Sequence, residues 1–199
     1  MKKLVFLISN AGSGTNLQSV IDAIEDNRIH ATILAVISDA SDARGVIRAK
    51  DHGIETYVLK QGENVEKIVS EYAPDYICLT GWKQIITDSF LKTFENKILN
   101  LHPGLIPDTM DGEVKNPDGT TALWNKGMFM DKAITNFLVN KATYAGSSIH
   151  FLSQEFDFGT VLARGFVSVE PDDKMESLYA RLKEKENQLY VEALQKLCN

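Results

Sequence analysis

Short apolar runs alternate with amphipathic segments through the first half of the chain. The apolar runs predict strands at 4–9, 32–38, 56–59, 76–80 and 98–101. The segments between them repeat apolar residues every three or four positions, which predicts helices at 15–26, 43–52, 65–72 and 88–94. Strands separated by single helices form βαβ units. The pattern therefore predicts an α/β fold of the Rossmann-like kind, with a mostly parallel, twisted sheet and helices on both faces.

The pattern changes after Pro107. Residues 108–131 contain Asp-Gly, Pro-Asp-Gly and Lys-Gly pairs and little periodicity, so we expect a long loop. A loop this long in a compact domain is usually functional or mobile. The rest predicts a helix at 132–140, an antiparallel pair of strands at 147–152 and 160–170, and a last helix after Pro171. With no repeat or linker, we expect one domain over residues 1–199.

Charge and cysteine content exclude several classes of protein. The chain has 21 Lys and Arg against 27 Asp and Glu, a formal net charge of −6, which argues against general nucleic-acid binding. Cys78 and Cys198 form no C-x-x-C pair, so neither a zinc site nor a redox motif is predicted. The apolar run after the first two lysines is too short for a secretion signal, and no run is long enough to span a membrane. We expect a cytoplasmic protein without a metal.

The loop after the first strand has the composition of an anion site. Its glycines allow close backbone approach, and the helix that follows presents free N–H groups. Leu17 stands where a dinucleotide fingerprint needs a third glycine, and no lysine follows as in a P-loop. The alternative is a tight turn between strand and helix. The candidate phosphate-binding residues are Gly12, Ser13, Gly14, Thr15 and Asn16.

The strand at 98–101 leads into the most informative segment, Asn100-Leu101-His102-Pro103. Alternate residues of a strand share a face, so Asn100 and His102 point the same way, at the end of the sheet where α/β folds bind ligands. An amide beside an imidazole suits an oxyanion that forms at a carbonyl. The alternative is a hydrogen-bonded pair that holds the turn.

Three further polar residues are less clear. His150 is either a second polar group at a site or a half-buried histidine. Asp157, in the loop between two predicted strands, is most often a turn residue by sequence alone. Glu186 falls on the apolar stripe of the last helix, formed by Met175, Leu178, Leu182, Leu189, Ala193 and Leu197. A carboxylate there needs a partner, which is either a salt bridge at the helix edge or a ligand hydroxyl.

At this point the residues resemble the folate-dependent formyltransferases over nearly the whole chain, and most closely the members that formylate glycinamide ribonucleotide. The segments that carry the resemblance are VFLISNAGSGTNLQSVIDA, YAPDYICLTGW, ILNLHPGLIP, GSSIHFLSQEFDFGTVL and YARLKEKENQLY. The combination of Asn-x-His-Pro with a distant Asp-x-Gly loop is highly specific.

The resemblance implies roles for these residues. Asn100, His102 and Asp157 match the catalytic three, residues 12–16 the phosphate loop, and Glu186 the acid that holds a ribose. His150 matches a histidine near the active site. The implied folate pocket comprises Trp82, Lys83, Gln84, Ile85 and Ile86, together with Leu152, Gln154, Glu155 and Phe156. Residues 1–101 would then bind the phosphate, and residues 102–199 would bind folate and carry the catalytic groups.

The implied reaction transfers a formyl group from 10-formyltetrahydrofolate to glycinamide ribonucleotide in de novo purine biosynthesis. The partners would be these two small molecules, with no nucleic acid or membrane, and the protein a monomer or homodimer. Alternatives are a formyltetrahydrofolate hydrolase, a formyltransferase acting on an amino sugar or an aminoacyl-tRNA, a non-catalytic nucleotide or folate binder, and a dinucleotide-dependent oxidoreductase.

The chain departs from the family pattern at four points. Its first loop is one residue longer, and Gln84 stands where the family usually has Arg. The Asp loop reads Asp-Phe-Gly rather than Asp-Gly-Gly, and residues 108–143 are longer than their counterpart and differ strongly from it. Because this last region borders both substrates in the family, the acceptor is the part of the prediction most affected.

Overall fold

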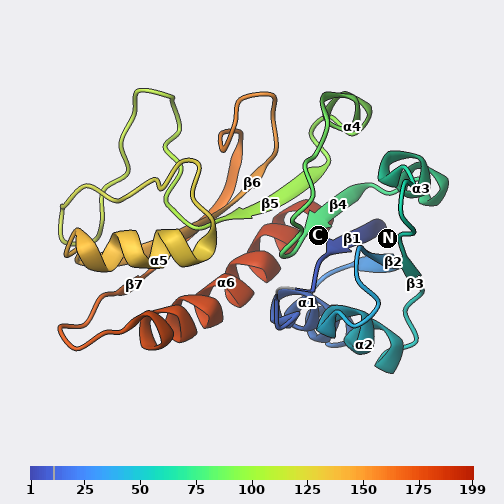
Figure 1. The fold of residues 1–199 in the computed structure, drawn as a ribbon, viewed down its shortest axis with the longest axis horizontal. Helices are drawn as coiled ribbons and strands as arrows, with labels where there is room; N and C mark the ends of the chain where they lie inside the picture. The colour runs from blue at the N-terminus through green and yellow to red at the C-terminus, as the bar shows by residue number, and fades with distance from the viewer. Residues whose placement is uncertain (11) are drawn as a thin grey trace. The chain divides into compact units, whose positions relative to one another are not determined.

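A computed structural model describes residues 1–10 and 12–199 of the chain. The chain divides into two compact units, residues 1–100 with 194–199, and residues 101–193. Figure 1 labels the helices and strands of both units and colours them from the N-terminus to the C-terminus. The division falls within one residue of the boundary expected between the two halves, although the last six residues belong to the first unit. A single domain over 1–199 stays a prediction.

The first unit is built on parallel strands. Each strand pairs in parallel with its neighbours, in the order β3-β2-β1-β4-β5. Residues 4–8 of β1 are at most 2% exposed, as expected for a strand covered on both faces. The strands are β1 Lys2–Ile8, β2 Ala31–Ser38, β3 Thr56–Val58, β4 Tyr76–Leu79 and β5 Ile98–His102.

Helices connect these strands as the hydrophobic pattern predicts. Two of them begin at side-chain caps: Asn64 accepts from the Lys67 N–H at 3.3 Å, and Thr87 accepts from the Phe90 N–H at 3.2 Å. Their ends agree with the predicted ends to within about one residue. The helices are α1 Thr15–Glu25, α2 Arg44–Asp51, α3 Val65–Tyr72 and α4 Asp88–Thr93.

The second unit pairs two antiparallel strands with two helices. β6 (Tyr144–Phe151) and β7 (Val161–Ser168) pair with a register shift between Ile149 and His150. α5 (Met130–Val139) packs against β6 and against α6 (Met175–Cys198), whose residues beyond 193 belong to the first unit. The shared core consists of Ala133, Ile134, Phe137, Ala145, Leu178 and Leu182. The strand order continues as β5-β6-β7, which confirms the predicted fold class of a mostly parallel sheet with antiparallel strands towards the C-terminus.

Some predicted boundaries in this unit were wrong. α5 begins at Met130, two residues early, and β6 begins at Tyr144, three residues early. Met175 was assigned to the buried stripe of the last helix, but it is 41% exposed because it occupies the first turn, at the rim of the core.

Candidate active site

β5 ends at the first two candidate catalytic residues. Asn100 and His102 are two positions apart on this strand, so their side chains share a face. His102 is only 2% exposed. The turn that follows is fastened by Ser148 of β6, whose hydroxyl donates to the Gly104 carbonyl at 2.7 Å and accepts from the Ile106 N–H at 3.0 Å. These bonds fix the backbone immediately after the imidazole.

Asp157 lies beside His102. Its Oδ1 is 3.6 Å from His102 Nδ1, and its Oδ2 accepts from the Gly127 N–H at 2.7 Å. Asp157 lies in the loop between β6 and β7. Its φ of 49° is in the left-handed region, which residues other than glycine, asparagine and aspartate seldom adopt. The sequence alone favoured a turn residue over a catalytic acid at this position, and the structure has a turn residue whose carboxylate faces the histidine.

The surroundings of Asp157 keep it ionised. Burial raises its pKa, but the adjacent His102 and the Gly127 N–H stabilise the carboxylate, so that its pKa lies below the usual value. His150 is fully buried, and its ring centroid is 6.3 Å from that of His102. Burial, followed by the nearby His102, lowers the pKa of His150 to about 4. At neutral pH the site therefore holds an ionised carboxylate, a neutral His150 and the imidazole of His102 in contact with the carboxylate.

A residue that the sequence did not single out completes this cluster. The Trp124 carbonyl oxygen lies 2.6 Å from His102 Nε2, and the Trp124 Nε1–H donates to the Asp157 carbonyl at 3.1 Å. Trp124 and Gly127 both belong to the aperiodic segment at 108–131, where hydrophobic spacing carries no information. The available signal was the presence of one of the chain's two tryptophans in this loop.

The loop before α1 has the features of an anion site. Gly14 precedes the helix with a φ of 69°, and a Cβ there would lie 3.0 Å from backbone atoms of Gly45, so both conformation and space require glycine. Among the residues that the structure describes, no side-chain hydrogen bond caps the start of this helix. Asn16 is 3% exposed, and its Oδ1 has no hydrogen-bond partner among the described residues.

Arg48 of α2 adds a positive charge to this loop. Its Nε donates to the Ser13 carbonyl at 3.1 Å, and its Nη1 donates to Gln18 Oε1 at 3.0 Å. The sequence alone does not single out Arg48, because this residue lies on α2, thirty-five positions after Ser13. The acidic chain thus provides a local cation where a phosphate would need one.

The predicted folate segment at 82–86 follows β4 in the first unit. The Lys83 N–H donates to Ser9 Oγ at 3.1 Å, and Ser9 Oγ donates to Asp39 at 2.8 Å. Gln84 Nε2 reaches the same carboxylate at 3.4 Å. Ile85 is 89% exposed beside these polar contacts. The segment therefore combines a fixed backbone with an open apolar side chain.

The second predicted folate segment forms a short turn in the second unit. Ser153 Oγ accepts from the Glu155 N–H at 3.1 Å and donates to the Phe158 carbonyl at 2.8 Å. Phe156 at the tip is 69% exposed. Leu152 is partly buried, whereas Gln154 and Glu155 are exposed.

Glu186 has protein partners on both carboxylate oxygens. Oε1 accepts from Ser147 Oγ at 2.8 Å, and Oε2 lies 3.2 Å from Lys183 Nζ. The residue is 0% exposed, and burial raises its pKa. This arrangement fits the salt-bridge alternative, and contact with a ribose stays a prediction that requires these partners to move.

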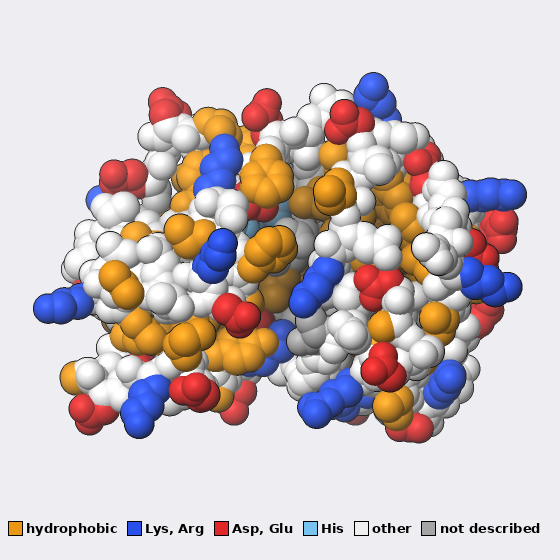
Figure 2. All heavy atoms as spheres, in the orientation of Figure 1, with side chains coloured by type: hydrophobic (Ala, Val, Ile, Leu, Met, Phe, Trp, Pro, Cys, Tyr) orange, Lys and Arg blue, Asp and Glu red, His pale blue; other side chains and the backbone are white. Residues whose placement is uncertain are grey.

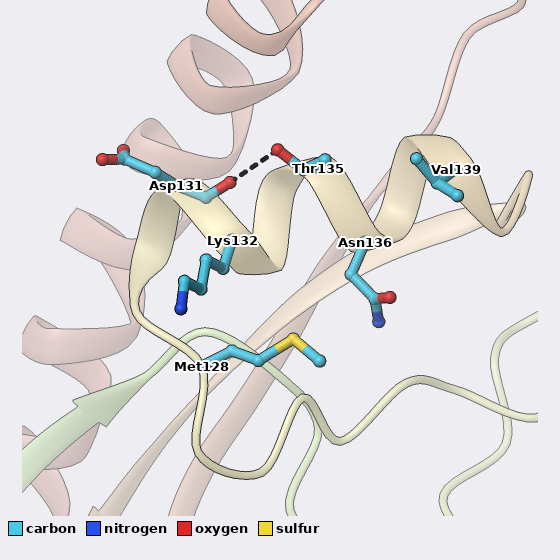
Figure 3. Close-up of a pocket in the computed structure, with 6 residues that line it drawn as sticks. All are labelled: Met128, Asp131, Lys132, Thr135, Asn136 and Val139. Atoms are coloured by element: carbon cyan, nitrogen blue, oxygen red, sulfur yellow. Dashed lines mark hydrogen bonds between the residues drawn. The ribbon is translucent and has the colours of Figure 1, made fainter.

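A separate cavity of about 410 Å³ lies on α5 and contains none of the predicted site residues. Figure 3 shows it between Met128 and the helix, with Lys132 and Asn136 at its sides. Exposed apolar side chains gather over α5 and the start of α6 (Figure 2). Phe129, at the start of α5, Val139, at its end, and Met175, at the start of α6, are all exposed.

The described residues contain no group of three or more His, Cys, Asp or Glu side chains that could hold a metal ion. None of the helices that the structure describes has the length and apolar content needed to cross a membrane.

An α/β fold with an Asn-x-His strand and a carboxylate facing the histidine is the arrangement expected of a formyltransferase. Comparison with known protein families gives the same class. A family described as "Formyl transferase" matches residues 2–194. The chain belongs to the formyl transferase family.

The relatives within this family include enzymes named for glycinamide ribonucleotide. The chain is 35% identical to a phosphoribosylglycinamide formyltransferase from Dictyostelium discoideum, over 94% of each chain. Among solved structures it resembles glycinamide ribonucleotide transformylase 1 from Symbiobacterium toebii, with a TM-score of 0.83, 28% identity, and coverage of 100% of this chain and 88% of that one.

Two comparisons are more limited. The chain spans 61% and 65% of the chloroplastic phosphoribosylglycinamide formyltransferases of Vigna unguiculata and Arabidopsis thaliana. A formyltetrahydrofolate deformylase from Pseudomonas syringae has a TM-score of 0.76 at 16% identity, with coverage of 98% of this chain and 60% of that one, which is a likeness of fold alone.

Proposed function

We propose that this protein transfers a formyl group from 10-formyltetrahydrofolate to the amine of glycinamide ribonucleotide, as a step of purine biosynthesis. The observation that carries the proposal is the pair His102 and Asp157, 3.6 Å apart, at the end of the strand that also bears Asn100. Membership of the formyl transferase family and the named relatives support the same reaction.

The proposed chemistry needs a donor to an oxyanion and a route for one proton. The neutral amine attacks the formyl carbon, and the formyl oxygen gains negative charge as the carbon–nitrogen bond forms. The Asn100 amide donates to that oxygen. The bond from the formyl carbon to the folate nitrogen then breaks, the amine loses a proton, and the folate nitrogen gains one. His102 and the ionised Asp157 accept and return this proton, directly or through water.

Substrate binding is proposed for residues outside this cluster. The loop at 12–16, with Arg48 beside it, would bind the phosphate of the acceptor, and Glu186 its ribose. The two exposed segments, 82–86 and 152–156, would bind the folate. A cytoplasmic location and a monomeric or homodimeric state belong to the same proposal.

The test is an absorbance assay of deformylated folate with purified protein. Three acceptors are compared: glycinamide ribonucleotide, water alone and an amino-sugar nucleotide. Release that requires glycinamide ribonucleotide supports the proposal. Equal release with water alone would identify a hydrolase, and release with the sugar nucleotide only would identify a sugar formyltransferase. Ligand binding without any release would leave a binding protein.

Two substitutions connect the assay to the site. Removing a single oxyanion donor typically lowers turnover about 10²–10³-fold, and we expect at least this loss in Asn100→Ala and in His102→Ala. Near-normal turnover in either folded variant would remove that residue from the mechanism.

A further inference from the structure

Residues 124–127 form a short segment that is hydrogen-bonded at both ends to the candidate catalytic pair, His102 and Asp157. We call it the 124–127 segment. At its start, Trp124 contacts both partners: its carbonyl lies 2.6 Å from His102 Nε2, and its indole donates to the Asp157 carbonyl. At its end, the Gly127 N–H donates to Asp157 Oδ2 at 2.7 Å. The segment therefore fixes the relative positions of imidazole and carboxylate.

The two ring nitrogens of His102 have different partners, and the Trp124 carbonyl determines which of them carries a proton. A carbonyl oxygen can only accept, so the nitrogen 2.6 Å away, Nε2, carries a proton. The other nitrogen, Nδ1, faces the carboxylate of Asp157. The proton on Nε2 is held by the backbone, and the nitrogen free to exchange a proton during a reaction is Nδ1.

Asn125 anchors the Trp124 carbonyl in this position. Its side chain is a bridge: Nδ2 donates to the Pro103 carbonyl at 2.7 Å, and Oδ1 accepts from Asn136 Nδ2 of α5 at 2.8 Å. It is 5% exposed and has a φ of 57°. The bridge joins the residue directly after His102 to a helix (Figure 3 shows Asn136 on α5), so the segment cannot shift without breaking a buried hydrogen bond.

We propose that Asn125 is a positioning residue for the formyl-transfer site, which acts by holding the Trp124 carbonyl on Nε2 of His102 and thereby directing Nδ1 to Asp157. The kinetic part of this inference rests on the proposed function, whereas the structural part does not. Asn125 touches neither reacting atoms nor the imidazole itself, and its effect passes through the backbone of Trp124.

Two variants separate this role from folding. Asn125→Gly deletes the bridge and keeps a residue that accepts a positive φ. Asn125→Asp keeps the shape and replaces the donor with an oxygen that faces the Pro103 carbonyl. The matched control is Asn116→Ala, since Asn116 is also buried, at 6% exposure, in the same long segment, where it donates to Thr120.

The first measurement is nuclear magnetic resonance of ¹⁵N-histidine protein, with the His102 signals assigned through His102→Gln. In the wild type we expect a hydrogen-bonded Nε2 proton that exchanges slowly with water. In both Asn125 variants we expect its exchange to rise about tenfold or more, as the segment opens more often. In Asn116→Ala we expect exchange within about twofold of the wild type.

The second measurement is formyl-transfer kinetics. Loss of an outer partner of a site residue typically costs about 10–100-fold, which we expect in kcat for both variants, with KM for either substrate changed less than about threefold. An unchanged ring proton and unchanged kcat in folded Asn125→Gly and Asn125→Asp would overturn the proposal. If the wild-type protein transferred no formyl group but its ring proton responded as described, the proposed function would fail and the positioning role would stand.

Discussion

Nδ1 of His102 and Oδ1 of Asp157 are 3.6 Å apart, which is longer than a hydrogen bond and within the range of an ion pair. The carboxylate is held on its other oxygen by the Gly127 N–H at 2.7 Å, so it cannot drift away from the ring. Catalytic hydrogen bonds are often long before substrate binds and shorten in the reacting complex. Under the proposed function, this separation is the one expected before substrate binds.

Asp157→Asn tests the charge on this pair. The amide oxygen can still accept from the Gly127 N–H, so we expect the fold to survive. General acid–base groups typically contribute about 10²–10⁴-fold, and kcat should fall within that range while folate binding persists. The control is Asp118→Asn, an exposed carboxylate of the loop at 108–131 that accepts from Thr120. Transfer by Asp157→Asn at the control's rate would contradict the proton role.

Arg48→Ala tests the anion site before α1. A hydrogen bond that involves a charged group contributes about 1.5–3 kcal/mol, so KM for glycinamide ribonucleotide should rise about 10–100-fold, with a smaller change in kcat. Lys50→Ala removes an exposed cation of the same helix and is the control. Equal KM values for the two variants would show that Arg48 contributes only to the net charge.

Gly104→Ala tests the packing of the turn after β5. A Cβ at this position would lie 1.8 Å from the Trp124 carbonyl oxygen, so either the turn or the 124–127 segment must move. Overpacking typically costs about 1–3 kcal/mol, and we expect a loss of that size in the free energy of unfolding measured with urea.

The control for Gly104→Ala is Gly62→Ala. Gly62 has a φ of 83° with nothing within 4 Å of the added Cβ, so this variant reports backbone strain without a clash, whereas Gly104 has no positive φ and its variant reports the clash. Gly104→Ala should also lose formyl transfer, because the displaced carbonyl is the one on His102. Full activity in Gly104→Ala would mean that this contact is not needed.

The low pKa of His150 predicts a pH-dependent stability. Its pKa is about 4 in the folded protein against 6.5 for the free side chain, so between these values the unfolded chain binds a proton that the folded chain excludes. Stability should therefore rise with pH across this window, by about 3 kcal/mol from this residue, and be fully gained above pH 6.5.

Urea unfolding at intervals from pH 4 to pH 7 measures this slope. His150→Gln should flatten it, and the control is His30→Gln, which removes an exposed histidine. The pKa of Asp157 is lowered, so its contribution has the same sign but is lost at lower pH, as the folded carboxyl is protonated. An unchanged slope in His150→Gln would mean that the ring is not buried as a neutral group.

The fold could be predicted because its determinants are local. Apolar runs such as 4–8 correspond to buried strands, and the turn residues around them mark the boundaries of each βα unit. The assignment of Asn100 and His102 to one face needed only the alternation of a strand. For Asp157 the sequence alone favoured a turn residue over a catalytic acid, and the family resemblance implied the catalytic role.

The remainder depends on contacts that spacing does not encode. Trp124 reaches His102 across twenty-two positions through its backbone carbonyl, a group that every residue possesses. Arg48 meets the loop before α1 only because α2 packs beside it through Gly45. Glu186 of α6 was predicted to need a partner, but Ser147, on strand β6, could not be identified as that partner from sequence.

The last six residues of the chain have a consequence for biosynthesis. Asn199 accepts from the His30 N–H at 3.0 Å and donates to the Arg28 carbonyl at 3.0 Å, so the tail belongs to the same compact unit as the first hundred residues. On the ribosome, the N-terminal strands emerge long before the tail that hydrogen-bonds to Arg28 and His30, next to β2. The nascent first unit therefore lacks these hydrogen bonds until residues 194–199 have left the exit tunnel.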